Sequence, residues 1–152
     1  MRKIRKKYKR PQRPWDLKRL EDEKVLMKEY GLRKKRELWK SQEILRQFRS
    51  RARELIAKKD EAKEKALIQR LARLGMLGKE STLDNVLALE IRSVLDRRLQ
   101  SLVQKRGISK TPLHARQLVS HGRILVAGKR AKFPSYLVPR DLEGQITLEA
   151  GK

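Results

Sequence analysis

The feature that most constrains this chain is its excess of positive charge. Lys and Arg number 41 against 18 Asp and Glu, which gives a formal net charge of +23 over 152 residues. A charge of this size repels itself, so a compact state is easiest to explain if a polyanion neutralises the surface. The hydrophobic fraction of 38% predicts a thin core rich in leucine. We therefore expect a polyanion-binding protein and not an ordinary metabolic domain.

Several classes of site are excluded or disfavoured by composition. The chain has no cysteine, so disulfide bonds, thiol catalysis and cysteine-ligated metals are excluded. The only two histidines, His114 and His121, make a poor metal set without cysteines. No apolar run approaches the ~20 residues of a membrane span, and the basic N-terminus lacks the apolar stretch of a secretory signal. We expect a cytoplasmic protein without enzymatic activity, cofactor, metal, membrane association or small-molecule substrate.

The charge is concentrated at the two ends of the chain. Residues 1–65 hold 25 basic and 11 acidic residues, a net charge of +14, whereas residues 66–95 have a net charge of only +1. Residues 96–152 hold 12 basic and 4 acidic residues, a net charge of +8. We interpret the nearly neutral middle as a buried connector between two surfaces that face the polyanion.

The first residues form a basic arm, which we place at residues 1–15. Eight of residues 1–13 are Lys or Arg, and Pro11 and Pro14 disfavour a helix. Such a stretch is either a solvated tail or an arm that becomes ordered on nucleic acid. The basic character of the rest of the chain favours the arm.

Residues 16–95 are predicted to form a helical domain. Asp16 can cap a helix that Gly31 ends, and Leu17, Leu20, Val25 and Leu26 lie roughly on one side of it. A longer helix over about 35–59 has one apolar stripe, formed by Leu38, Leu45, Phe48, Ala52 and Leu55. Arg46, Arg49 and Arg53 recur on another face, which either holds phosphates or is merely solvated. A third helix covers 60–74, and a short one begins at Ser81 or Thr82.

Residues 96–152 are predicted to change from helix to a mixture of helix and sheet. The spacing of apolar residues indicates one helix from Ile91 to Gly107. Thr111 and Pro112 are typical of the start of a second helix, which ends at Gly122. The segments 124–126 and 129–133 flank the turn Ala127-Gly128 like a hairpin, residues 135–138 are expected to return as a strand, and residues 146–148 form a last strand.

A known family matches the motifs of this region. The stretches DRRLQSLVQKRG, ARQLVSHGRI and LVAGKRAKFPSY resemble the S4 RNA-binding module, two helices packed on a small, mostly antiparallel sheet. The stretches KKYKRP and YGLRKKRELW resemble the N-terminal region of the archaeal type of the ribosomal protein S4 family. The resemblance implies an α+β fold with a basic arm, a helical domain and an S4 module at the boundaries given above.

The resemblance also implies a function and a set of partners. A member of this family would be a structural constituent of the small ribosomal subunit that clamps a helix junction in the 5′ domain of its ribosomal RNA. It would nucleate assembly, border the messenger RNA, and contact neighbouring proteins that include S5, an interface tied to translational accuracy. The alternatives are an assembly-factor relative or an S4-domain stress protein that binds ribosomal RNA only transiently.

The candidate RNA-binding residues follow from the charge pattern and the resemblance together. In the arm they are Arg2, Lys3, Lys6, Lys7, Lys9 and Arg10. In the helical domain they are Lys34, Lys35, Arg36, Arg46, Arg49 and Arg53. In the module they are Arg97, Arg98, Lys105, Arg106, Lys110, Arg116, Arg123, Lys129, Arg130 and Lys132. Short polar donors and one aromatic ring complete the set, namely Gln117, Ser120, His121, Ser135 and Tyr136.

The sequence allows two interpretations of Tyr136 and does not fix the conformation of Ala127. Tyr136 either stacks on a base or covers the sheet. Ala127 stands where the family usually has Asn before the hairpin glycine, and it costs roughly 1 kcal/mol if the turn needs a positive φ there.

Overall fold

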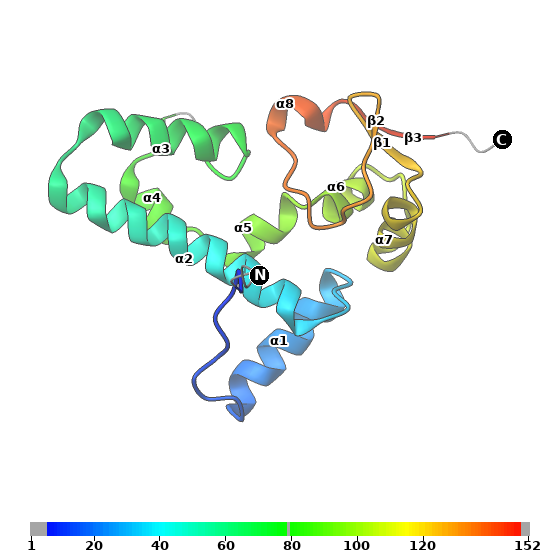
Figure 1. Ribbon diagram of the computed structural model, residues 1–152, viewed down its shortest axis with the longest axis horizontal. Coiled ribbons are helices and arrows are strands. Elements are labelled where there is room, and N and C mark those ends of the chain that lie inside the picture. The colour runs from blue at the N-terminus through cyan, green and yellow to red at the C-terminus, as the bar shows by residue number, and fades with distance from the viewer. Residues whose placement is uncertain (1–5, 79, 150–152) are drawn as a thin grey trace, which may run out of the picture.

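The computed structural model describes residues 6–78 and 80–149. Its elements follow in the order α1 (Leu17–Glu29), α2 (Lys35–Lys58), α3 (Glu61–Arg73), α4 (Leu83–Ala88), α5 (Ile91–Asp96), α6 (Leu99–Lys105), α7 (Pro112–Ser120), β1 (Ile124–Val126), β2 (Lys129–Arg130), α8 (Arg140–Glu143) and β3 (Ile146–Leu148). The predicted α+β fold is confirmed: a helical N-terminal part precedes a module that contains α6, α7, the short α8 and a small sheet (Figure 1).

Helix α2 is the axis of the N-terminal part. It contacts α1, α3, α4 and α5, and Figure 1 shows α3 and α4 above it and α1 below its N-terminal end. The apolar stripe predicted from the sequence is buried at Leu38, Leu45, Phe48 and Ala52. Together with side chains of α3 and α4, most of this stripe forms the first of three core clusters.

Helix α1 differs from the prediction. Leu17 and Val25 were expected on its apolar side but are 76% and 60% exposed. The only buried residue of α1 is Glu23, because its carboxylate accepts hydrogen bonds from Arg19 and Trp39. Helix α1 is therefore held by a polar contact that its hydrophobic pattern does not reveal, together with Leu26 and Met27, which pack against a core cluster.

The single helix predicted from Ile91 to Gly107 is wrong. The structure divides it into α5 and α6 at Arg97 and Arg98, and Arg98 has the extended dihedral angles φ −72° and ψ 143°. Arg98 also forms an isolated antiparallel bridge with Leu137, and the Leu99 N–H donates to the Tyr136 carbonyl at 2.7 Å. The predicted strand at 135–138 is reduced to this bridge, because its backbone pairs with the interruption between the helices.

The module packs α6 and α7 against a three-stranded antiparallel sheet in the order β2-β1-β3. Leu125 is paired with Arg130 in β2 and with Thr147 in β3, so the predicted hairpin and last strand are confirmed. Leu99, Leu102 and Val103 of α6 belong to the core cluster of the module. A third, smaller cluster of Leu32, Leu38 and Leu95 joins α2 and α5 to the segment that follows α1.

Candidate RNA interface

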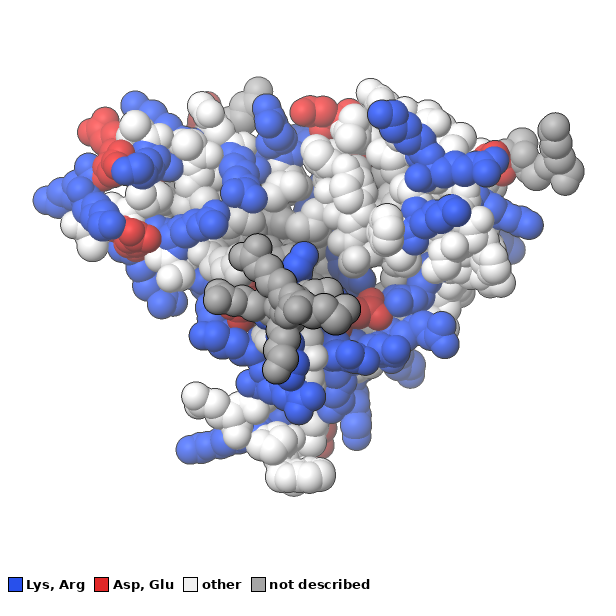
Figure 2. Space-filling model, in the orientation of Figure 1, with Lys and Arg blue, Asp and Glu red and all other residues white. Residues whose placement is uncertain are grey.

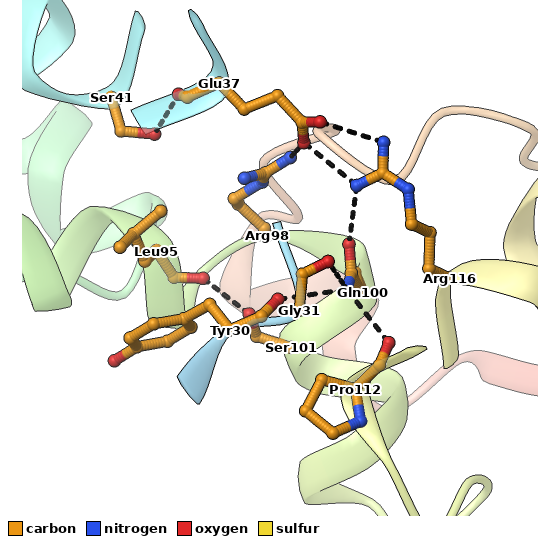
Figure 3. A network of polar contacts seen from close by, with 10 residues as sticks. All are labelled: Tyr30, Gly31, Glu37, Ser41, Leu95, Arg98, Gln100, Ser101, Pro112 and Arg116. Carbon is orange, nitrogen blue, oxygen red and sulfur yellow. Dashed lines mark hydrogen bonds and ion pairs between the residues drawn. The ribbon is translucent and has the colours of Figure 1, made fainter. Parts of the chain in front are cut away.

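A buried ion-pair network joins the two parts of the chain (Figure 3). Glu37, in the first turn of α2, accepts hydrogen bonds at both carboxylate oxygens from Arg116 of α7, each at 2.9 Å. The Arg98 Nη2 atom donates to the same carboxylate at 2.8 Å. The Arg98 side chain is 4% exposed and that of Arg116 is 20% exposed. We call this network, with Gln100, the Glu37 latch.

Within the Glu37 latch, Gln100 makes the contact with the loop between α1 and α2. Its Nε2 atom donates to the backbone carbonyls of Tyr30 at 3.0 Å and Pro112 at 2.9 Å, while its Oε1 atom lies 3.4 Å from Arg116 Nη1. Gln100 is 1% exposed. Because the Gln100 amide is buried and fully engaged, it fixes the distance between that loop and the start of α7.

The electrostatics of the Glu37 latch favour the charged carboxylate. Burial raises the pKa of Glu37, but the hydrogen bonds and charges of Arg116 and Arg98 outweigh burial, so that the pKa lies below its ordinary value. The Nε and Nη1 atoms of Arg98 are buried without a hydrogen-bond partner. Glu37 is therefore the main compensation for a buried guanidinium, which makes its charge structurally important.

Arg97, the residue before Arg98, is engaged mainly within the module. Its guanidinium donates to Glu143 of α8 at 2.8 Å and to the Val138 carbonyl at 3.0 Å. It also lies against Gly75 at the end of α3, where an added Cβ would be 2.9 Å from Arg97 Cζ. The Arg97 side chain is 11% exposed. Arg97 thus joins α8 and the segment at Val138 to the start of the module and packs against Gly75, whereas Arg98 pairs with α2 of the helical part.

These contacts give Arg97, Arg98 and Arg116, three of the candidate RNA-binding residues, partners within the chain. Arg98 is 3% exposed as a residue, which makes it the least accessible of the three. The terminal N–H groups of Arg97 and Arg116 donate hydrogen bonds to carboxylates of this chain. The physical reason is that a buried guanidinium needs a partner, and α2 and α8 supply it.

The remaining candidate cations fall into two groups in the described part of the chain. Some are exposed without an ion pair there: Lys6, Lys7, Lys9, Arg10, Lys34, Arg36, Arg53, Lys110, Arg123, Lys129 and Lys132. Others are engaged: Lys35 with Glu23, Arg46 with Glu43, Lys105 with Asp96, Arg130 with Glu149, and both Arg49 and Arg106 with backbone carbonyls. Arg2 and Lys3 lie outside the described residues.

Several exposed candidate RNA-binding residues lie at the C-terminal end of α7 and in the hairpin of β1 and β2. Gly122 ends α7, and an added Cβ there would lie 3.3 Å from Lys132 Cε, so Lys132 crosses the end of the helix. Ser120, His121 and Arg123 flank this contact and are exposed. We call Ser120, His121, Arg123, Lys129 and Lys132 the hairpin surface. Gln117, Ser135 and Tyr136 of the module are exposed as well, and the Tyr136 ring is not part of the core.

Positive side chains also dominate at the scale of a whole face. Figure 2 shows Lys and Arg over both the helical part and the module, with Asp and Glu as a few separate patches. The described residues contain no cluster of three His, Asp or Glu side chains suited to a metal ion. No helix among them has the length and hydropathy to cross a membrane.

Sequence reasoning did not identify an aromatic group beside the arm. The Trp15 side chain is 86% exposed, and Tyr8 and Trp39 form a tilted pair with ring centroids 5.8 Å apart. Together with Arg10 and Arg36 they line one groove. The sequence did hold one signal of this group, namely Trp15 within a stretch of cations. Trp is mostly buried in folded proteins, so its presence in a basic arm indicates a contact surface and not only a solvated tail.

The sequence of this chain is similar to those of one family of known proteins. Residues 97–143 match the S4 domain family. The chain is 50% identical over 148 residues to the small ribosomal subunit protein uS4 of Ignicoccus hospitalis, with 95% of this chain and 89% of that protein covered. It is 46% identical to the protein of the same name from Methanoregula boonei, with coverage of 97% and 83%. It is 45% identical to that of Korarchaeum cryptofilum, with coverage of 96% and 89%.

Proposed function

The chain belongs to the uS4 family of small ribosomal subunit proteins, and from this premise we propose that it is a structural component of the small subunit that binds ribosomal RNA. Its exposed cations hold phosphates, and the protein acts by fixing RNA helices relative to one another without any turnover. Duplex RNA hides its base edges, so this surface reads the shape of the backbone and not the sequence.

One observation supports this function more than any other. Two cationic surfaces, on the helical part and on the module, are held in a fixed relation by the Glu37 latch. A rigid protein with two such surfaces suits a junction of RNA helices, because each surface contacts a separate duplex. Phosphate contacts made by preformed cations also lose less side-chain entropy than those of mobile tails.

The same proposal covers the finer functions implied by the family. The RNA site is a helix junction in the 5′ domain, bound early so that the protein nucleates assembly. In the finished subunit the protein borders the messenger RNA and contacts S5, and this contact influences translational accuracy. Its place in the cell is the ribosome.

The RNA-binding surface is tested by comparing two variants that lose equal charge. The first replaces Arg123 and Lys129 of the hairpin surface by Gln, and the second replaces Lys63 and Lys65 of α3 by Gln. Binding to a 5′-domain junction RNA is measured over a range of salt concentrations. Log affinity falls as log salt rises, and each lost phosphate contact makes this fall less steep by roughly 0.7–0.9. The first variant should therefore show a slope less steep by about twice that amount, whereas the second should keep the wild-type slope. Equal changes in both variants would indicate non-specific attraction and refute the hairpin surface.

The ribosomal assignment is tested by sedimentation of a native cell extract. A structural component is present at one copy per mature small subunit, even after a wash with moderate salt. A transient assembly factor is found with precursor particles, and a stress protein with large subunits. Absence from mature small subunits therefore contradicts the proposal.

A further inference from the structure

The aromatic groove beside the arm has a composition that the phosphate surfaces do not share. It measures about 1060 Å³ and lies between the arm and the first turns of α1 and α2. Its apolar side includes Tyr8, Trp15 and Trp39, and its polar side includes Arg10, Lys34 and Arg36. Flat rings and cations thus share one concave surface in the part of the chain that the structure describes.

The groove is held in shape by a buried carboxylate. Glu23 is 2% exposed and accepts hydrogen bonds from Arg19 at 2.6 Å and from the Trp39 indole at 3.1 Å. The same Arg19 donates to the backbone carbonyls of Arg13 and Pro14 at 3.0 and 2.9 Å. The arm is therefore tied to α1 and α2, and the groove exists before any ligand arrives.

The charge of the groove is positive once its internal pairs are counted. Glu23 lies beneath it and is already paired with Arg19 and Lys35. Arg10, Lys34 and Arg36 are exposed, and none of the described residues that line the groove is acidic. An occupant must therefore bring negative charge as well as a flat apolar surface.

We propose that this groove binds an unpaired nucleotide of the RNA, with its base stacked on Trp15 and its phosphate held by the cations of the rim. The inference rests on the proposed function for the identity of the polyanion. A nucleotide joins an aromatic ring to a phosphate in one unit, which matches both sides of the groove. An acidic peptide would match only the cations, and a fully paired duplex would keep its bases away from Trp15.

The experiment uses the full chain and follows tryptophan fluorescence. The chain has only two tryptophans, so the difference between wild type and Trp15→Phe isolates the emission of Trp15. The probe is an oligoadenylate of about ten nucleotides, a length typical of single-strand sites. We expect the probe to quench Trp15. We also expect Trp15→Ala to bind it roughly 5- to 100-fold more weakly, the range typical of one lost stacking contact.

Matched variants separate stacking from damage to the fold. Trp15→Phe retains a ring and is expected to keep most of the affinity. Leu17→Ala removes an apolar side chain that is 76% exposed and lies outside the groove, and it should bind as wild type does. Unchanged affinity in Trp15→Ala, or an equal loss in Leu17→Ala, overturns the inference.

Two further probes identify the occupant. A duplex RNA of the same length without unpaired nucleotides should leave Trp15 unquenched, and so should a polyglutamate of equal charge. Quenching by polyglutamate would assign the groove to an acidic protein segment instead, and quenching by the duplex would exclude base stacking. Each variant is also tested on the junction RNA. If wild type binds that RNA with a steep salt dependence and Trp15→Ala does so equally, the proposed function stands even though the stacking site fails.

Discussion

Glu37 shows how much of this architecture depends on a single carboxylate. In the sequence it is an ordinary acidic residue in the first turn of a helix, where it complements the helix dipole. In the fold it accepts hydrogen bonds from Arg98 and Arg116, which come from the module 61 and 79 residues away. This one carboxylate thus links the module to the start of α2.

Replacing Glu37 by Gln is expected to reduce the free energy of unfolding by about 3 kcal/mol at pH 7, because two guanidinium groups lose their charged partner inside the protein. The loss should depend on pH. The pKa of Glu37 is lowered in the folded state, so its contribution is complete above the unfolded pKa of about 4.3 and is lost as the pH falls through the folded value. The measurement is urea unfolding of both proteins between neutral and acidic pH.

A matched substitution provides the control for Glu37. Glu54 pairs with Lys58 on the exposed surface of α2, and Glu54→Gln should unfold at the wild-type urea concentration at neutral pH. If the difference between wild type and Glu37→Gln stayed constant down to acidic pH, the charge of Glu37 would not be what stabilises the fold.

At the scale of elements, the hairpin between β1 and β2 carries a conformational cost. Both residues of its turn have positive φ, 49° for Ala127 and 74° for Gly128. A two-residue turn with two positive φ angles suits Asn-Gly, whereas alanine meets a steric cost because of its Cβ atom. The structure thereby answers the question that the sequence left open, since Ala127 does occupy the left-handed region.

Replacing Ala127 by Asn should therefore raise the free energy of unfolding by about 0.5–1 kcal/mol. The exposed Ala66 in the middle of α3 provides the same substitution in a helix, where Asn is expected to lower stability by roughly 0.5 kcal/mol. Thermal and urea unfolding of the two variants give the comparison. A loss of stability in both variants would mean that the turn is not strained by alanine.

At the scale of the whole molecule, the net charge of +23 acts on the free and the bound protein in opposite ways. Without RNA, the exposed cations of both parts repel one another. With RNA, the same cations neutralise phosphates, so the repulsion becomes a source of affinity. Stability and binding should therefore respond to salt with opposite signs.

Raising the salt concentration from roughly 0.05 to 0.3 M shortens the Debye length to well below the width of the protein. We expect the urea midpoint of the free chain to rise over this range while its affinity for junction RNA falls. Both are measured on one preparation in the same buffers. A midpoint that decreases with salt would show that internal ion pairs outweigh the repulsion between surface cations.

The sequence by itself determined those elements whose formation depends on interactions between residues close together along the chain. Helical periodicity located α2 and α3, and the side chains of Asp16 and Thr111 cap α1 and α7 as predicted. The motifs of residues 96–136 identified the family, and the alternation of polar and apolar residues located the last strand. These features need only interactions within a few residues, which a sequence pattern records directly.

Only the tertiary structure decided which cations are available. The apolar period runs unbroken through Arg97 and Arg98, so the sequence did not reveal the interruption of the helix or the burial of both guanidinium groups. Their partners lie far away along the chain, and the same is true of the rings and cations that form the groove at Trp15. Whether an arginine binds phosphate or carboxylate depends on what lies beside it in space, and that is fixed only when distant segments pack together.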